Sequence, residues 1–234
     1  IYHTAMVRAS GYANCIAWVD LTNEKVEYRE VDEEDARKFI GGRGLGGRIV
    51  LKHAVGKDPL SPENVLAIMN GPLTGTLTPM SGRICAVSRA PLTGILGDSH
   101  AGGWAGATLK WAGFDGVVLT GSSDKPVYLL VKKKTVSIED ASNLWGKTAE
   151  EAYHMLREKH GEEVQFYGIG PGGENKVKFA NIMHYGKQSM GRASGRTGMG
   201  AIMGSKKVKC LAILGEERDM PKPARPDEFE KARQ

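Results

Sequence analysis

The chain has 234 residues, of which 41% are hydrophobic and 25% charged, and its formal net charge is +5 at pH 7. This composition predicts a globular chain with one large or two small domains. No apolar run approaches the roughly 20 residues that span a bilayer, and the scattered basic residues match no nucleic-acid-binding module, so we expect neither a membrane nor a nucleic acid as partner.

The N-terminal part predicts an extension followed by a hairpin and two helices. Residues 1–10 are interpreted as an N-terminal extension, and alternating patterns at 13–20 and 25–31 predict two strands joined by a polar turn. Asp32 is placed to cap a helix that ends at Gly41. The glycine-rich segment 41–48 then begins a second helix.

The middle of the chain predicts buried strands between repeated turns. Apolar runs at 65–69 and 83–88 are typical of such strands, and the tetrapeptide Pro-Leu-Thr-Gly occurs twice around the second, at 72–75 and 91–94. The glycine-rich stretch that follows is interpreted as a loop leading into a helix at 103–112. The N–H groups at a helix start, with glycine beside them, predict an anion site at Gly102 and Gly103.

The C-terminal half predicts more strands than helices. We expect strands at 116–120, 127–131, 135–138, 164–169, 177–183 and 208–214. A capping box of Thr148 and Glu151 begins one clear helix that ends at Gly161, and residues 170–173 are expected to form a turn. The sequence becomes polar and proline-rich after Gly215, with Asp227 as the expected cap of a new helix. We therefore place a domain at 11–215 and a linker, or the start of another domain, at 216–234.

Three glycine-rich segments with arginines suggest a phosphate-binding site. They lie at 41–48, 97–106 and 191–200, and the arginines nearby are Arg43, Arg83, Arg192 and Arg196. Backbone N–H groups and guanidinium groups would hold a phosphate if these segments converge; otherwise the glycines serve tight turns and close packing. No Walker motif occurs, and the run 195–200 is judged to lack the strand–turn–helix context of a nucleotide site.

His100 is the best single candidate for a site residue. It precedes the expected helix start in a glycine loop, although a structural hydrogen bond within that loop explains it too. Its neighbour Ser99 gives no catalytic triad, because no nucleophile elbow is present. The other histidines that we considered show no metal-ligand spacing and are interpreted as surface or structural: His53, His154, His160 and His184.

The three cysteines predict buried free thiols. Cys15, Cys85 and Cys210 are odd in number and far apart in apolar contexts, which suits a reducing, cytoplasmic environment. No CxxC pair occurs. A complete zinc or iron–sulfur site is therefore not expected within this chain alone.

A long series of motifs resembles one family. The series comprises GGRGLG near residue 42, DPLSPEN at 58–64, GPLTGT, SGR at 81–83, PLTG, HAGGWAG, LKWAGFDGVVLTG, IGPGGEN at 169–175, VKFANIM and GRTGMGAIMGSK. In this order and spacing they resemble the N-terminal domain of the tungsten-dependent aldehyde ferredoxin oxidoreductases, from Gly11 to about Gly215. The resemblance implies an α+β, strand-rich fold of two packed β-sheets and a few helices.

The resemblance also implies a cofactor role for particular residues. In the family this domain is the base for a tungsten bis-pyranopterin (molybdopterin-type) cofactor, and the positions matching Arg83 and His100 contact it. The family has asparagine where this chain has His100, and histidine is a poorer magnesium ligand. The main-chain carbonyl matching Ala193 helps to hold a magnesium ion between the two pterin phosphates. The implied cofactor-binding set is Arg83, His100, Gly102, Gly103, Ala193, Gly195 and Arg196.

The implied activity belongs to a larger enzyme. Family members oxidise aldehydes to carboxylic acids and pass electrons through a 4Fe–4S cluster to ferredoxin, and the cluster cysteines and acid/base residues lie in later domains. We therefore expect no catalytic residue here and no catalysis without those domains or a subunit that carries them; a homodimer is a further alternative. Two other functions stay open: part of a benzoyl-CoA reductase-type member, and a stand-alone module that binds a phosphorylated pterin or nucleotide.

Overall fold

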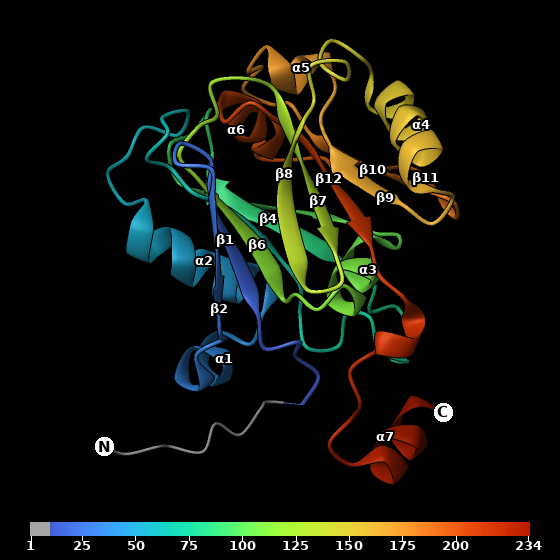
Figure 1. Cartoon of the computed structure of the whole chain (residues 1–234). Coiled ribbons are helices and arrows are strands. Elements are labelled where there is room, and N and C mark those ends of the chain that lie inside the picture. Colours follow the sequence, from blue (N-terminus) through green and yellow to red (C-terminus); the bar gives the residue numbers. More distant parts are fainter. Residues whose placement is uncertain (1–9) are drawn as a thin grey trace.

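The computed structural model describes residues 10–234, so most of the predicted extension 1–10 lies outside the described residues. Two six-stranded sheets form the centre of the molecule (Figure 1). No helix in the described part of the chain is long and apolar enough to cross a membrane.

The first sheet has the strand order β2-β1-β6-β3-β4-β5. Its strands are β1 (Ile16–Asp20), β2 (Lys25–Arg29), β3 (Leu66–Met69), β4 (Ile84–Arg89), β5 (Leu96–Ala101) and β6 (Gly116–Thr120). Only the β1–β6 pairing is parallel, and the other neighbours are antiparallel. Among the strands that the structure describes, β5 pairs only with β4 and is therefore an outer strand.

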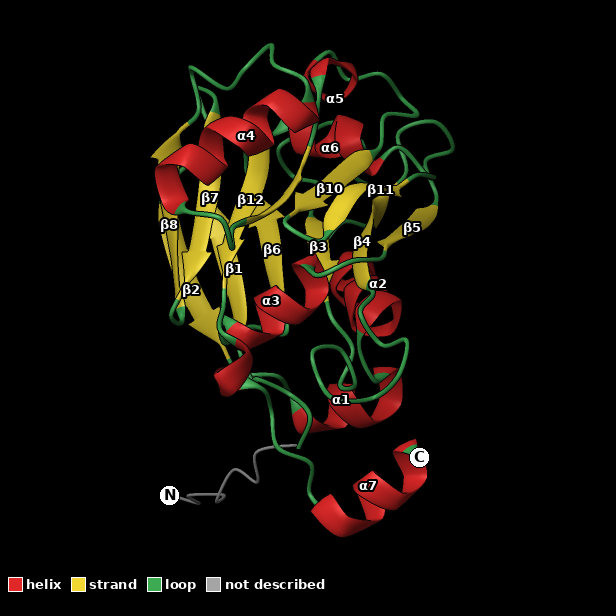
Figure 2. Cartoon of the chain, turned by 90° about the vertical axis from the view of Figure 1, so that its right-hand side faces the viewer, coloured by secondary structure: helices red, strands yellow, loops and turns green. Residues whose placement is uncertain are grey.

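The second sheet has the order β11-β10-β9-β12-β7-β8. Its strands are β7 (Val127–Lys132), β8 (Thr135–Asp140), β9 (Gln165–Gly168), β10 (Ile182–Gly186), β11 (Ser189–Ser194) and β12 (Val208–Leu214). The β7–β12 pairing is parallel and the rest are antiparallel. β11 is an outer strand, and Figure 2 shows it beside β5 of the first sheet.

Helices cover both outer faces of the paired sheets. The helices are α1 (Glu33–Phe39), α2 (Gly42–His53), α3 (Ala105–Trp111), α4 (Ala149–His160), α5 (Pro171–Glu174), α6 (Met199–Ser205) and α7 (Pro226–Arg233), with a 3₁₀ turn at Glu217–Asp219. α2 packs on β3 and β4, whereas α4 packs on β9 and β10, so the two helices lie on opposite sides of the strands (Figure 1).

One apolar cluster joins the two sheets. It combines residues of the first sheet, such as Leu119, with residues of the second, such as Leu211 and Ile213, all fully buried. Leu109 of α3 and Ile202 of α6 extend the same cluster. Because this one cluster contains inward-facing residues of both sheets, we infer that the two sheets fold as one unit.

The fold class that was predicted, two packed sheets with a few helices, is confirmed. Local chemistry accounts for much of it: the Asp32 side chain accepts a hydrogen bond from Asp35 N at the start of α1, and Thr148 and Glu151 form the predicted capping box of α4. The hairpin of β1 and β2 is also confirmed. The domain boundary near residue 215 stays a prediction.

Five local predictions are wrong. Residues 97–101 form part of β5 rather than a loop, because Gly97 lets the chain approach Thr197, whose Cβ would lie 2.9 Å from a Cβ at that glycine. The predicted turn 170–173 is largely the short helix α5, begun by Pro171. The predicted strand 177–183 begins only at Ile182, because Ala180 N bonds Val177 O in a turn.

The fourth error concerns the third glycine-rich segment. The run 195–200 does have a strand–turn–helix context, because β11 precedes it and α6 follows it. The fifth error lies at the C-terminal end, where Arg225 occupies the N-cap position of α7 and Asp227 lies within its first turn rather than at the cap. Acidic residues are favourable in the first turn of a helix as well as at the N-cap, because both positions lie near the positive end of the helix dipole. The sequence alone therefore does not distinguish the two positions for Asp227.

Candidate functional site

The outer edge of β5 is the place where two of the three glycine-rich segments meet. Arg196 N donates a hydrogen bond of 3.2 Å to Ser99 Oγ, and Thr197 Oγ1 donates one of 3.3 Å to the Asp98 carbonyl. The turn between β11 and α6 therefore runs along β5. The first glycine-rich segment does not join this group: it forms α2, where Gly46 allows close packing on Val87.

A buried histidine anchors the loop that follows β5. His184 Nδ1 donates to the Phe166 carbonyl at 3.0 Å, and its Nε2 accepts from Trp104 N at 3.2 Å. Burial lowers the pKa of His184 to about 4, so the imidazole is neutral near pH 7. Gly103 has a φ of +92°, and a Cβ there would lie 2.6 Å from His184 Cδ2. Glycine is thus required at 103 by the fold itself.

Unlike Gly103, Gly102 and Gly195 are not required to be glycine by contacts within the protein. A Cβ at either position would meet no atom within 4 Å, and neither backbone lies in the left-handed region. Among the 31 glycines, all within the described residues, only these two combine both properties. The protein's own packing therefore gives no reason for glycine at either position, whereas a ligand held against the backbone N–H groups does. This arrangement fits a phosphate-bearing group.

Three arginines near this edge are exposed. Arg83 ends the segment before β4, Arg192 lies in β11 and Arg196 lies in the turn after it. None of them forms an ion pair or a side-chain hydrogen bond with the described residues. The Arg83 carbonyl lies 3.1 Å from a Cβ placed at Gly106, which puts this residue beside the start of α3. Unpaired guanidinium groups beside an open backbone favour an anionic ligand.

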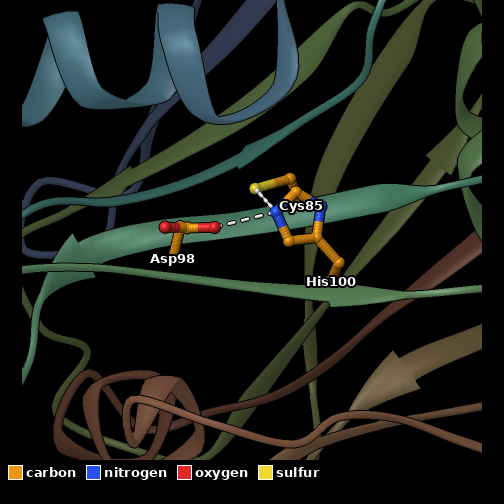
Figure 3. A group of neighbouring side chains, drawn as sticks. All are labelled: Cys85, Asp98 and His100. Atoms are coloured by element: carbon orange, nitrogen blue, oxygen red, sulfur yellow. Dashed lines mark hydrogen bonds and ion pairs between the residues drawn. The ribbon is translucent and has the colours of Figure 1, made fainter.

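His100 lies on the other face of β5. Strand alternation puts Asp98 and His100 on the face that carries Cys85, its partner in β4, whereas Ser99 faces the turn that contains Arg196. His100 Nε2 lies 2.8 Å from Asp98 Oδ2 and 3.6 Å from Cys85 Sγ (Figure 3). His100 and Arg196 thus lie on opposite faces of β5 rather than sharing one face.

Sequence reasoning missed Asp98 and Cys85 as neighbours of His100. Asp98 and His100 are two residues apart, and this spacing places both side chains on one face only in a strand. Because the sequence predicts a loop here, this spacing gave no signal, although the segment is β5. Burial and the nearby Asp98 charge raise the pKa of the Cys85 thiol to about 12. As predicted, Cys85 and Cys210 are buried free thiols, whereas Cys15 is only half-buried.

Among the described residues, neither Ala193 nor the cavity beside Trp104 adds a hydrogen bond to the group at the edge of β5. Ala193 is exposed and pairs with Met183 across β10 and β11, and the magnesium role of its carbonyl stays a prediction. A cavity of about 640 Å³ lies next to Trp104, Trp111 and Gln188. None of its lining residues belongs to the predicted cofactor-binding set.

Comparison with known families decides the relationship of the chain. The family described as aldehyde ferredoxin oxidoreductase, N-terminal domain, matches residues 16–215. The chain belongs to this family. The resemblance inferred from the motifs is therefore confirmed.

Family members with different reactions are similar to this domain. The tungsten-containing aldehyde ferredoxin oxidoreductase of Pyrococcus furiosus is 46% identical over 201 residues, which are 85% of this chain and 33% of that protein. The WOR-like subunit of an aliphatic sulfonate oxidoreductase from the same organism is 41% identical, over 84% of this chain and 33% of that protein.

A solved structure shares the fold. The active site complex BamBC of benzoyl coenzyme A reductase matches with a TM-score of 0.89 and 30% identity, covering 95% of this chain and 33% of that one. The chain therefore spans about a third of the length of the proteins that it matches. The family as a whole includes oxidoreductases that act on different substrates.

Proposed function

We propose that this domain forms the base of a tungsten bis-pyranopterin site and holds the cofactor's phosphate groups along the outer edge of β5. The observation that carries the proposal is the open backbone at Gly102 and Gly195, where no Cβ would meet the protein within 4 Å. Backbone N–H groups without a covering side chain suit close approach of a phosphate. The tungsten-containing relatives make this cofactor the best candidate for the ligand.

The roles of the chain's own residues follow from their position. Arg83 and Arg196, exposed and unpaired within the described part of the chain, would direct their guanidinium forks at phosphate oxygens. The Ala193 carbonyl would ligate a magnesium ion between the phosphates, since backbone carbonyl oxygen is a hard ligand. When bound, the tungsten centre supplies two-electron redox chemistry. No residue of this domain is assigned a proton-transfer step.

We further propose that the complete enzyme oxidises aldehydes to carboxylic acids with ferredoxin as acceptor. The 4Fe–4S cluster and the substrate pocket would be provided by sequence outside this domain, in the same or another polypeptide. The 46% identity to an aldehyde enzyme favours this substrate class. A benzoyl-CoA reductase-type enzyme is the second candidate, favoured by the TM-score of 0.89 to that complex.

The test is to measure cofactor content in glycine variants. The tagged chain, with any polypeptide that associates with it, is purified without oxygen from cells grown with tungstate; tungsten is quantified by elemental analysis and pterin by mass spectrometry. We expect two phosphorylated pterins per tungsten in the wild type. Gly102→Leu and Gly195→Leu should lower both contents several-fold, because a side chain would occupy the phosphate position.

The matched control is Gly172→Leu, because Gly172 is exposed, its backbone is outside the left-handed region, and a Cβ there would come no closer than 4.0 Å to Ala180 Cβ. This variant should keep the wild-type content. A folded wild type without pterin, or full content in both site variants, contradicts the proposal. Dye-linked assays with aldehydes and with benzoyl-CoA then separate the two candidate substrate classes.

A further inference from the structure

Three potential metal ligands meet on the face of the first sheet that α2 covers. Cys85 and His100 are register partners in β4 and β5, and Asp98 lies two residues before His100 on the same face. One ligand atom from each of the three residues lies within 4.8 Å of the others (Figure 3). Because the three residues come from two neighbouring strands, they form no closely spaced metal-binding motif in the sequence.

The distances suit a tetrahedral ion. With metal–sulfur and metal–nitrogen bonds of about 2.3 and 2.0 Å, two ligands at the tetrahedral angle lie about 3.5 Å apart. The Cys85 Sγ to His100 Nε2 distance is 3.6 Å, close to this value. The His100 Nε2 to Asp98 Oδ2 distance is 2.8 Å, a hydrogen bond, and must widen. The Asp98 side chain is 34% exposed and can move by that amount.

The charges also suit a divalent cation. A thiolate and a carboxylate provide two negative charges, which neutralise the ion, and the imidazole adds a neutral ligand. On binding, the Cys85 thiol proton passes to solvent, and the proton that His100 shares with Asp98 moves to Nδ1. The side chains of His100 and Asp98 are 37% and 34% exposed, so solvent reaches two of the three ligands, whereas Cys85 is buried.

We propose that Cys85, Asp98 and His100 bind one divalent transition metal of the zinc class through three protein ligands, with the fourth position open to water. Sulfur, nitrogen and oxygen donors together select zinc or cobalt over magnesium and calcium, which prefer oxygen. The site uses the face of β5 opposite to Ser99 and Arg196, so it lies apart from the proposed phosphate position, and it shares only His100 with the cofactor contacts that the family resemblance implies.

The test is a cobalt titration of the full chain after it has been reduced and stripped with a chelator. A thiolate ligand gives Co²⁺ an intense charge-transfer absorption, which zinc should abolish by displacement. We expect one cobalt per chain with this absorption. Cys85→Ser should remove the thiolate band, and Asp98→Asn and His100→Asn should each weaken binding more than about tenfold.

Matched controls are Cys15→Ser and His154→Asn, a half-buried cysteine and an exposed histidine outside the cluster. Both should bind cobalt as the wild type does, and circular dichroism should confirm that every variant is folded. The proposal is overturned if the wild type shows no thiolate band, if the band persists in Cys85→Ser, or if it disappears in Cys15→Ser. If Cys85→Ser does not fold, unchanged cobalt affinity in folded Asp98→Asn overturns it equally.

Discussion

At the scale of single residues, substitutions of His100 distinguish the proposed phosphate site from the proposed metal site. Asparagine at this position can still donate and accept hydrogen bonds toward a cofactor, whereas leucine can do neither. We expect His100→Asn to retain the tungstopterin and His100→Leu to lose at least half of it, measured as pterin per chain in the assembled enzyme.

Equal retention in both variants would contradict a cofactor contact by His100. The same His100→Asn protein should bind cobalt poorly. The two readouts therefore distinguish a failure of the metal site from a failure of the phosphate site.

His184 makes stability depend on pH. Its pKa is lowered to about 4 in the folded protein by burial, below the ordinary value of 6.5, so the unfolded state binds more protons between these values. The contribution of His184 to the free energy of unfolding is therefore fully present above pH 6.5 and is lost as the pH falls toward 4. We expect about 3 kcal/mol of unfolding free energy to be lost over this range.

The measurement is urea denaturation at several pH values, compared with His184→Asn. The variant should be less stable at pH 7, because the bonds to Phe166 and Trp104 are altered, but its pH dependence should be flatter. Taking the difference between the two proteins removes the contribution of the carboxylates. Parallel pH profiles would show that His184 is not the group responsible.

At the scale of elements, a buried ion pair fixes α3 to the start of the chain. Lys110 and Asp115 are both fully buried and paired, and Asp115 accepts hydrogen bonds from Ala13 N at 3.0 Å and Cys15 N at 3.3 Å. Asp115→Asn leaves the Lys110 charge unpaired, which should cost about 3–5 kcal/mol.

Chemical denaturation measures this cost. Asp124→Asn is the control, because its side chain is exposed and outside any ion pair of the described residues; it should change stability by less than about 0.5 kcal/mol. A similarly small effect of Asp115→Asn would show that the pair adds nothing to the attachment of α3.

The elements also show what the sequence could predict. Caps at Asp32 and Thr148 and the apolar strands depend on neighbouring residues, so they were predicted correctly. β5 was missed because Gly97 resembles a loop glycine, although it permits contact with Thr197, a hundred residues later. The metal cluster depended on that strand. Long-range contacts of this kind leave no local pattern.

In the candidate site, too, local features could be predicted from the sequence and long-range contacts could not. The motifs indicated Gly102 and Gly195, and the open space at both agrees with a ligand contact. The sequence could not show that His184 is the anchor of Gly103, because this contact joins the loop before α3 to β10, 80 residues later in the chain. Nor could it show that His100 and Arg196 lie on opposite faces of β5, since the strand itself was not expected.

At the scale of the whole molecule, the shared core predicts that both sheets unfold together. Leu119 of β6 is fully buried between the sheets. Leu119→Ala should cost about 2–5 kcal/mol and should raise hydrogen exchange in β7 and β12 as much as in β6. Faster exchange confined to the first sheet would mean that the sheets are separate cooperative units.

In the proposed holoenzyme, phosphate groups of a pterin cofactor lie along the outer edge of β5. A crystal structure of the tungsten-loaded enzyme, purified without oxygen, tests this most directly. We expect phosphate density against the backbone of Gly102 and Gly195, within hydrogen-bond distance of Arg83 or Arg196. Cofactor density elsewhere, with both glycines facing solvent or protein, would contradict it.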